Sequence, residues 1–161
     1  FLALFLISIS LLITLRSIKL GLLSLIPNVL PTMMAFGAWA ILVGDLGMSG
    51  GAVLVIALGI IVDNTIHFLS KYLRAKRELH MNTRDAIHYS FRTVGLALLV
   101  TSVILVLGFS MLYGSAFKPT KDMGLLISLT VAFALTATYF IIPPLLLIFD
   151  GDKPKNENKS K

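Results

Sequence analysis

Long apolar runs separated by short polar breaks constrain this chain more than any other feature of its sequence. Several runs reach the roughly 20 residues that an α-helix needs to cross a hydrocarbon core about 30 Å thick. Charged residues make up only 14% of the chain, whereas a typical soluble domain has about a quarter. Because these charges gather in the breaks between the runs, we predict an all-α, polytopic membrane protein.

Five apolar runs predict five transmembrane helices in one domain, residues 1–149. They occupy about residues 1–15, 20–43, 52–70, 94–113 and 123–149. The chain opens with Phe1 inside an apolar run, so we expect a fragment of a longer protein with a truncated first helix. Neither a basic region before that run nor a small-residue cleavage site after it marks a signal peptide. The polar tail at 150–161 has no apolar anchors, and we expect it to be disordered.

Residues 82–92 predict one short amphipathic helix between the third and fourth runs. Asn82 suits the N-cap, and Asp85 places a carboxylate in the first turn, where the helix dipole favours it. Apolar or small residues recur at helical spacing on one face, and Arg84 and Arg92 fall largely elsewhere. We expect this helix to lie along the cytoplasmic surface of the membrane.

The distribution of Lys and Arg predicts the orientation of the helices, because cytoplasmic loops are enriched in both. The breaks after the first, third and fifth runs hold 12 of the 14 basic residues, and the other two breaks hold only Lys118 and Lys121. We therefore place the C-terminus in the cytoplasm and the chain in a cell membrane, which we expect to be a bacterial inner membrane. The same asymmetry accounts for the net charge of +6. No basic face accompanies an aromatic reading surface, so we expect no nucleic-acid partner.

Two prolines, Pro27 and Pro31, lie inside the second apolar run. Each removes a backbone donor and favours a kink. In a bilayer such breaks are tolerated where neighbouring helices satisfy the freed backbone groups. We therefore expect this helix to pack within the bundle.

Asp63 lies inside the third run, eight residues before Lys71. At a rise of 1.5 Å per residue, it sits roughly 12 Å below the cytoplasmic end of the helix. A charged aspartate near the centre of a membrane helix costs about 2.5–3.5 kcal/mol on insertion scales. Protonation removes that charge, so a carboxyl at this depth is suited to coupling a proton gradient to movement.

Four further polar residues accompany Asp63. His67 follows it by four residues and shares its helix face, and Asn64 is its chain neighbour. Thr101 and Ser102 lie seven to eight residues into the next run, roughly 11–12 Å from its cytoplasmic start. Because consecutive runs are antiparallel, we expect both hydroxyls to reach the depth of the carboxyl. We predict that these five residues form a proton relay.

Each of these residues also has a plain structural interpretation. Asp63 can be a pin that is hydrogen-bonded to neighbouring helices, and His67 can extend toward the interface or cap a helix. Thr101 and Ser102 can bond back to carbonyls of their own helix. For Gly59, one turn before Asp63, we predict close helix packing rather than an ion site.

Other chemistries find little support in the sequence. The chain has no cysteine, which excludes disulfides and thiolate metal sites. It has no glycine-rich phosphate loop of the Walker type, and no signal arranges a serine, a histidine and an aspartate as a triad. The three histidines lack metal-ligand spacing with carboxylates. We expect neither enzymatic activity nor a cofactor or metal.

The stretch from Gly59 to Leu69 resembles the GxxxD motif of the resistance–nodulation–division superfamily, with Asp63 as its acid. It is most similar to the predicted-exporter and MMPL-like branch, which is related to Patched and the sterol-sensing domain proteins. The resemblance continues over nearly the whole chain, through Asp85-Ala86-Ile87, Thr101-Ser102, Gly108-Phe109, Ser115-Ala116-Phe117 and the prolines at 27, 31 and 143.

This resemblance implies proton-driven export of lipids or other hydrophobic molecules. It also implies two similar halves, each with one helix, an extracytoplasmic domain and five further helices, and it places this chain in the C-terminal half. The implied partners are membrane lipids, the N-terminal transmembrane half, the extracytoplasmic domains and further copies of the protein. The motif acid takes part in proton relay in such proteins, which implies that role for Asp63, with hydroxyls on the next helix, Thr101 and Ser102, assisting.

The chain departs from the family pattern at two positions. Asn64 stands where many relatives carry a second acid or a tyrosine, and Thr138 stands where many carry an aspartate. Two other functions stay open: a sterol-sensing-like module that binds lipid without transport, and the accessory branch associated with the Sec translocon. His67-Phe68-Leu69 matches the exporter branch better, because the Sec branch has an acidic-basic pair there.

Overall fold

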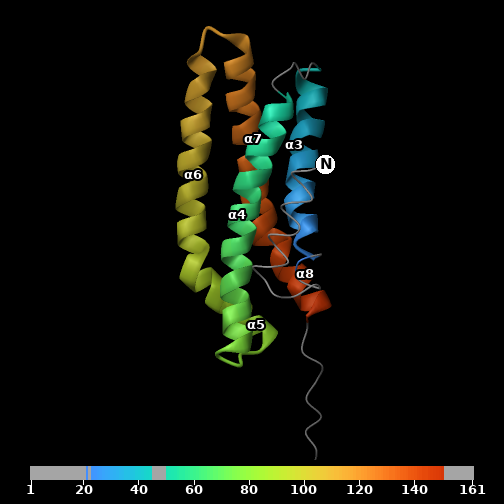
Figure 1. The fold of residues 1–161 in the computed structure, drawn as a ribbon, viewed down its shortest axis with the longest axis vertical. Coiled ribbons are helices and arrows are strands. Elements are labelled where there is room, and N and C mark those ends of the chain that lie inside the picture. Colours follow the sequence, from blue (N-terminus) through green and yellow to red (C-terminus); the bar gives the residue numbers. More distant parts are fainter. Residues whose placement is uncertain (1–20, 22, 45–49, 151–161) are drawn as a thin grey trace, which may run out of the picture.

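The computed structural model describes residues 21, 23–44 and 50–150 (Figure 1). In these ranges every regular element is helical and none is a strand, which confirms the all-α class. Four helical stretches of the described chain are long and apolar enough to cross a membrane: Leu25–Leu42, Gly50–Arg77, Thr83–Gly114 and Lys118–Phe149. The predicted helix at residues 1–15 and the predicted disorder of the tail beyond Asp150 lie outside the described residues.

The first two described spans are α3 (Leu25–Leu42) and α4 (Gly50–Arg77). Helix α4 was expected to end near residue 70, but it continues through the basic stretch to Arg77. Hydropathy marks the part of a helix that suits lipid, whereas the helix itself ends where its hydrogen bonds end. The Arg74 Nε donates to Glu78 Oε2 at 2.7 Å, and basic side chains in the last turn complement the helix dipole. Both effects extend α4 beyond its apolar part.

The predicted amphipathic helix corresponds to α5 (Thr83–Ser90). No break separates it from the next span, because a π-helical turn, η1 (Phe91–Gly95), joins it directly to α6 (Leu96–Ser110). Asn82 occupies the predicted N-cap position, but its side chain makes no capping hydrogen bond. Ala86 and Ile87 are buried in a core cluster of the protein. The apolar face of α5 therefore packs on protein, and a location along the membrane surface stays a prediction.

The last predicted run divides into two helices, α7 (Lys118–Phe140) and α8 (Ile142–Phe149). A 3₁₀ turn, η2 (Met111–Gly114), and a short loop precede α7. Pro119 stands in the first turn of α7, where its missing N–H has no helical partner to lose. Pro143 and Pro144 lack the N–H groups that would continue the helical ladder across Ile141. The helix is therefore interrupted at Ile141, between α7 and α8.

The helices form an elongated bundle in which α7 packs against α3, α4 and α6 (Figure 1). Among the described residues, buried side chains form two core clusters. One includes Phe68 and Tyr72 of α4, Ile87 of α5 and Leu146 of α8, and the other includes Trp39 of α3, Val53 of α4 and Ile127 of α7. The outer side of α6 is exposed and apolar, as suits contact with lipid or another membrane segment: Leu96, Leu99, Val100, Val103, Ile104 and Leu107.

Candidate functional site

A hollow with a volume of about 390 Å³ lies between α4 and α6. Four of its lining residues carry polar side chains: Asp63, Asn64, His67 and Thr101. The others are Gly59, Ile60, Val94, Ala97, Leu98 and Leu105. Four of the five predicted relay residues therefore line one hollow, to which both α4 and α6 contribute.

Asp63 and His67 form a pair within this hollow. Asp63 lies midway along the 28-residue α4, and its Oδ1 is 3.4 Å from the Nε2 of His67 one turn later. Their side chains are 70% and 59% exposed on this chain. The predicted shared face is confirmed, and the hollow that holds both groups opens outward rather than into the core.

The polar residues of α4 and α6 that were predicted to share one depth lie at the same level along the bundle. Thr101 lines the same hollow as Asp63, and the Asn64 Nδ2 donates to the Ser102 Oγ at 3.5 Å. Asn64 and Ser102 are both buried, at 5% and 1% exposure, so this contact belongs to the interface between α4 and α6. Ser102 is the one predicted relay residue that does not line the hollow.

The hydroxyl of Thr101 already has acceptors on its own helix. Its Oγ1 lies 2.9 Å from the carbonyl oxygen of Ala97 and 3.2 Å from that of Leu98. This is the back-bonding that a threonine in a helix commonly adopts. The lone pairs of Thr101 stay available toward the hollow, while its single hydrogen is engaged in α6.

The three residues predicted to serve helix packing differ in their surroundings. Pro27 and Pro31 are buried, as expected for a helix inside the bundle. Gly59 is exposed, and a Cβ atom built on it would meet nothing within 4 Å. No helix of the described chain packs closely against it, so its predicted packing role is not seen there. Its missing side chain instead widens the hollow.

A second polar contact, which the sequence did not predict, joins α4 to α3. The Thr65 Oγ1 donates to the Asn28 Oδ1 at 2.6 Å, and both side chains are buried. A signal was present, because an amide side chain between two prolines of an apolar run needs a partner in a bilayer. The sequence did not show which helix supplies that partner.

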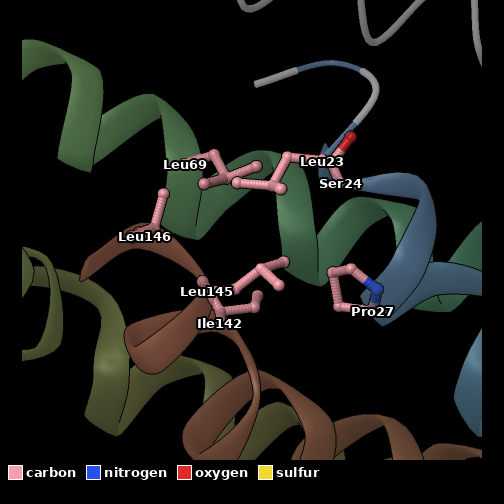
Figure 2. Close-up of a pocket in the computed structure, with 7 residues that line it drawn as sticks. All are labelled: Leu23, Ser24, Pro27, Leu69, Ile142, Leu145 and Leu146. Carbon is pink, nitrogen blue, oxygen red and sulfur yellow. The ribbon is translucent and has the colours of Figure 1, made fainter. Parts of the chain in front are cut away.

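A small gap at the junction of α3, α4 and α8 offers no alternative site (Figure 2). Its volume is about 10 Å³, which is at the lower limit for one water molecule. Its lining is apolar apart from Ser24, whose hydroxyl donates to the Gly21 carbonyl at 2.7 Å. Figure 2 shows Leu23, Ser24 and Leu69 along one side of the gap and Ile142, Leu145 and Pro27 along the opposite side. We interpret it as a packing gap.

Metal ligands are also sparse: no three His, Asp or Glu side chains of residues 21, 23–44 and 50–150 come together in a way that could hold an ion.

Comparisons with known proteins bear on the family rather than on the site. Neither the curated proteins nor the solved structures contain a match to this chain. One protein-family model, described as the MMPL family, matches residues 1–161. This match confirms the resemblance inferred from Gly59, Asp63 and the motifs that follow them. The chain belongs to the MMPL family.

Proposed function

We propose that this chain is the C-terminal membrane part of a proton-driven exporter of lipids or other hydrophobic molecules. The observation that carries the proposal is the pairing of Asp63 with His67, 3.4 Å apart, midway along an apolar helix. Ionisable groups at such depth are costly and commonly mark ion or proton pathways. Membership of the MMPL family supports the same function.

In this proposal Asp63 takes up and releases the transported proton. The imidazole of His67, whose Nε2 lies 3.4 Å from the Asp63 Oδ1, is a neighbouring group that stabilises the carboxylate, together with the water that enters the hollow. Protonation of Asp63 removes the negative charge and weakens that attraction. Because α4 and α6 both line the hollow, a change of charge there alters the free energy of their packing, which is how proton uptake would drive movement.

The outward opening of the hollow supports a further membrane partner. Intramembrane carboxylates face a bundle interior or a water-filled cavity rather than lipid, yet Asp63 is 70% exposed on this chain. We propose that the N-terminal transmembrane half covers the hollow, and that lipid covers the rest of the apolar face of α6. Extracytoplasmic domains and further copies of the protein remain expected partners on family grounds.

Replacing Asp63 with asparagine tests the proposal, because this change keeps the size of the side chain and removes its charge. We expect proton-dependent efflux of a hydrophobic fluorescent dye from proteoliposomes to be abolished, with protein levels unchanged. Asp85→Asn is the matched control, because Asp85 lies in the first turn of α5, away from the hollow. Undiminished dye efflux driven by the proton gradient in Asp63→Asn would rule the proposal out.

A lipid-binding module without transport is the second candidate, and the lining of the hollow favours it. Six of the ten lining residues are apolar, and about 390 Å³ falls in the range of small-molecule sites. In that case binding of a fluorescent sterol or lipid would survive both collapse of the proton gradient and the Asp63→Asn change. Loss of binding under either condition would favour the exporter.

A further inference from the structure

We infer that Asn28 of α3 is a positioning residue, which fixes the rotation of α4 about its axis and so keeps Asp63 in the hollow. The inference rests on the proposed function, because only a proton relay requires Asp63 to stay in the hollow. The contact that supports it, between Asn28 and Thr65, lies outside the hollow. Asn28 contributes nothing to the lining of the hollow, and it reaches α4 from the buried side.

The contact between Asn28 and Thr65 is short and dry. The Thr65 Oγ1 lies 2.6 Å from the Asn28 Oδ1, and the two residues are 2% and 0% exposed. The carbonyl oxygen of Ile61 is a second acceptor for Thr65, at 3.1 Å. A hydroxyl has one hydrogen, so Asn28, at the shorter distance, is its main acceptor.

The position of Thr65 on α4 explains how its contact with Asn28 restricts rotation of the helix about its axis. Successive residues of an α-helix are about 100° apart around its axis, so Thr65 lies roughly opposite Asp63 while Asn64 lies between them. Asn64 contacts Ser102 of α6 at 3.5 Å, and Thr65 contacts Asn28 of α3 at 2.6 Å. Two polar contacts to two different helices hold α4 in one rotation.

The buried amide of Asn28 lowers the stability of the folded protein, so packing alone does not explain why an amide stands at this position. Its Nδ2 is buried without a hydrogen-bond partner among the residues that the structure describes, and an unsatisfied buried donor destabilises a folded protein. An apolar side chain at the same place would fill the space without that cost. A directional bond, by contrast, distinguishes one rotation of α4 from its neighbours, which an apolar contact does poorly.

Single introduced thiols report this rotation, because the chain has no cysteine of its own. A cysteine at Gly59 faces the hollow, where an added Cβ meets nothing within 4 Å. A cysteine at Val62 reports the buried flank of the same helix, since Val62 is 7% exposed. Each is placed in the protein that carries this chain and labelled in membranes with a small methanethiosulfonate reagent.

Thr65→Val removes the hydroxyl while keeping the shape of the side chain, and Thr65→Ser restores the hydroxyl. In Thr65→Val we expect the ratio of the labelling rate at position 59 to that at position 62 to fall by roughly threefold to twentyfold, the population change matching polar contacts between membrane helices. Thr65→Ser should restore the ratio. Asn28→Ala, which removes the acceptor instead, should lower it like Thr65→Val.

Three outcomes would overturn the inference. Unchanged labelling at both positions in Thr65→Val and Asn28→Ala would mean that packing alone sets the rotation. A parallel rise at both positions would mean that the bundle has merely loosened. Failure of Thr65→Ser to restore the ratio would mean that the hydroxyl is not the cause. The proposed function fails separately, if Asp63→Asn transports normally while the labelling ratio still responds to Thr65→Val.

Discussion

At the scale of single residues, glycines in this bundle have opposite roles that the sequence alone does not separate. A Cβ added at Gly124 of α7 would lie 2.5 Å from the carbonyl oxygen of Phe109 and 2.6 Å from the Cβ of Leu112. Real Cβ atoms do not approach backbone so closely, and a carbonyl oxygen fixed in a helix cannot turn aside. Gly124 is therefore where α7 comes into contact with the end of α6. At Gly59 and Gly108 the added atom would meet nothing within 4 Å.

Gly124→Ala should lower the free energy of unfolding by about 1–3 kcal/mol, the usual cost of overpacking. The measurement is the midpoint of thermal unfolding in detergent, followed by the loss of helical circular dichroism. Gly108→Ala is the matched control, because it adds the same methyl group inside α6 where space is open. Its expected effect is neutral or stabilising, since alanine favours a helix over glycine by roughly 0.5–1 kcal/mol. Equal midpoints for the two variants would contradict the close approach at Gly124.

At the scale of elements, the junction between α5 and α6 depends on a π turn held from α7. The Tyr139 hydroxyl donates to the carbonyl oxygen of Gly95 at 2.7 Å, which gives a partner to a backbone group in the widened turn. Phe91 at the start of the turn packs edge-on against Phe68, with ring centroids 4.8 Å apart, and lies 5.2 Å from the Tyr139 ring. One tyrosine thus supports the turn through its ring and through its hydroxyl.

Tyr139→Phe keeps the ring and removes the hydrogen bond, so it isolates the second contribution. We expect amide hydrogen exchange in residues 91–98 to accelerate, by roughly fivefold if the bond contributes about 1 kcal/mol, while exchange in α3 stays unchanged. Tyr113→Phe serves as the control, because Tyr113 lies in η2 with its side chain 54% exposed. Exchange over residues 91–98 that matches the unmodified protein would show that the turn does not depend on Tyr139.

Sequence patterns located the described helices but not their ends. Apolar length marks what suits a bilayer, so the spans containing Pro27, Asp63 and Thr101 were found without difficulty. The basic extension of α4 to Arg77, the division at Ile141 and the π turn at Phe91–Gly95 were missed. These features depend on which hydrogen bonds form along the backbone, and hydropathy carries little information about them.

At the scale of the whole molecule, features of the site that depend on one helix were predictable, whereas contacts that depend on which helices are neighbours were not. Spacing along one helix predicted the pairing of Asp63 with His67, and counting residues from the membrane boundary predicted that Thr101 reaches the same depth. The contact of Asn28 with Thr65 joins α3 to α4 across the core. No local pattern specifies which side of α4 faces α3, and only the packed bundle does.

The two ends of the bundle differ in charge, and this difference predicts its orientation in the membrane. Six of the eight Lys and Arg residues in the described chain lie between Lys71 and Arg92, around the α4–α5 turn, and the other two are Lys118 and Lys121 near the start of α7. Figure 1 places α5 and α8 at one end and the α6–α7 turn at the other. Enrichment of basic residues marks the cytoplasmic side, so the α5 end should face the cytoplasm.

Cysteines introduced at Leu79 and Ala116 test this orientation, because both residues are exposed. Leu79 lies between α4 and α5, and Ala116 lies between η2 and α7. In sealed right-side-out vesicles, a membrane-impermeant maleimide should label Ala116→Cys directly and Leu79→Cys only after permeabilisation. This chain has no cysteine, so labelling of the protein without an introduced cysteine gives the background signal. The reverse pattern would invert the proposed topology. Labelling of both positions in sealed vesicles would place them on the same side of the membrane. That result would show that the helix from Thr83 to Gly114, which lies between them, does not span the bilayer.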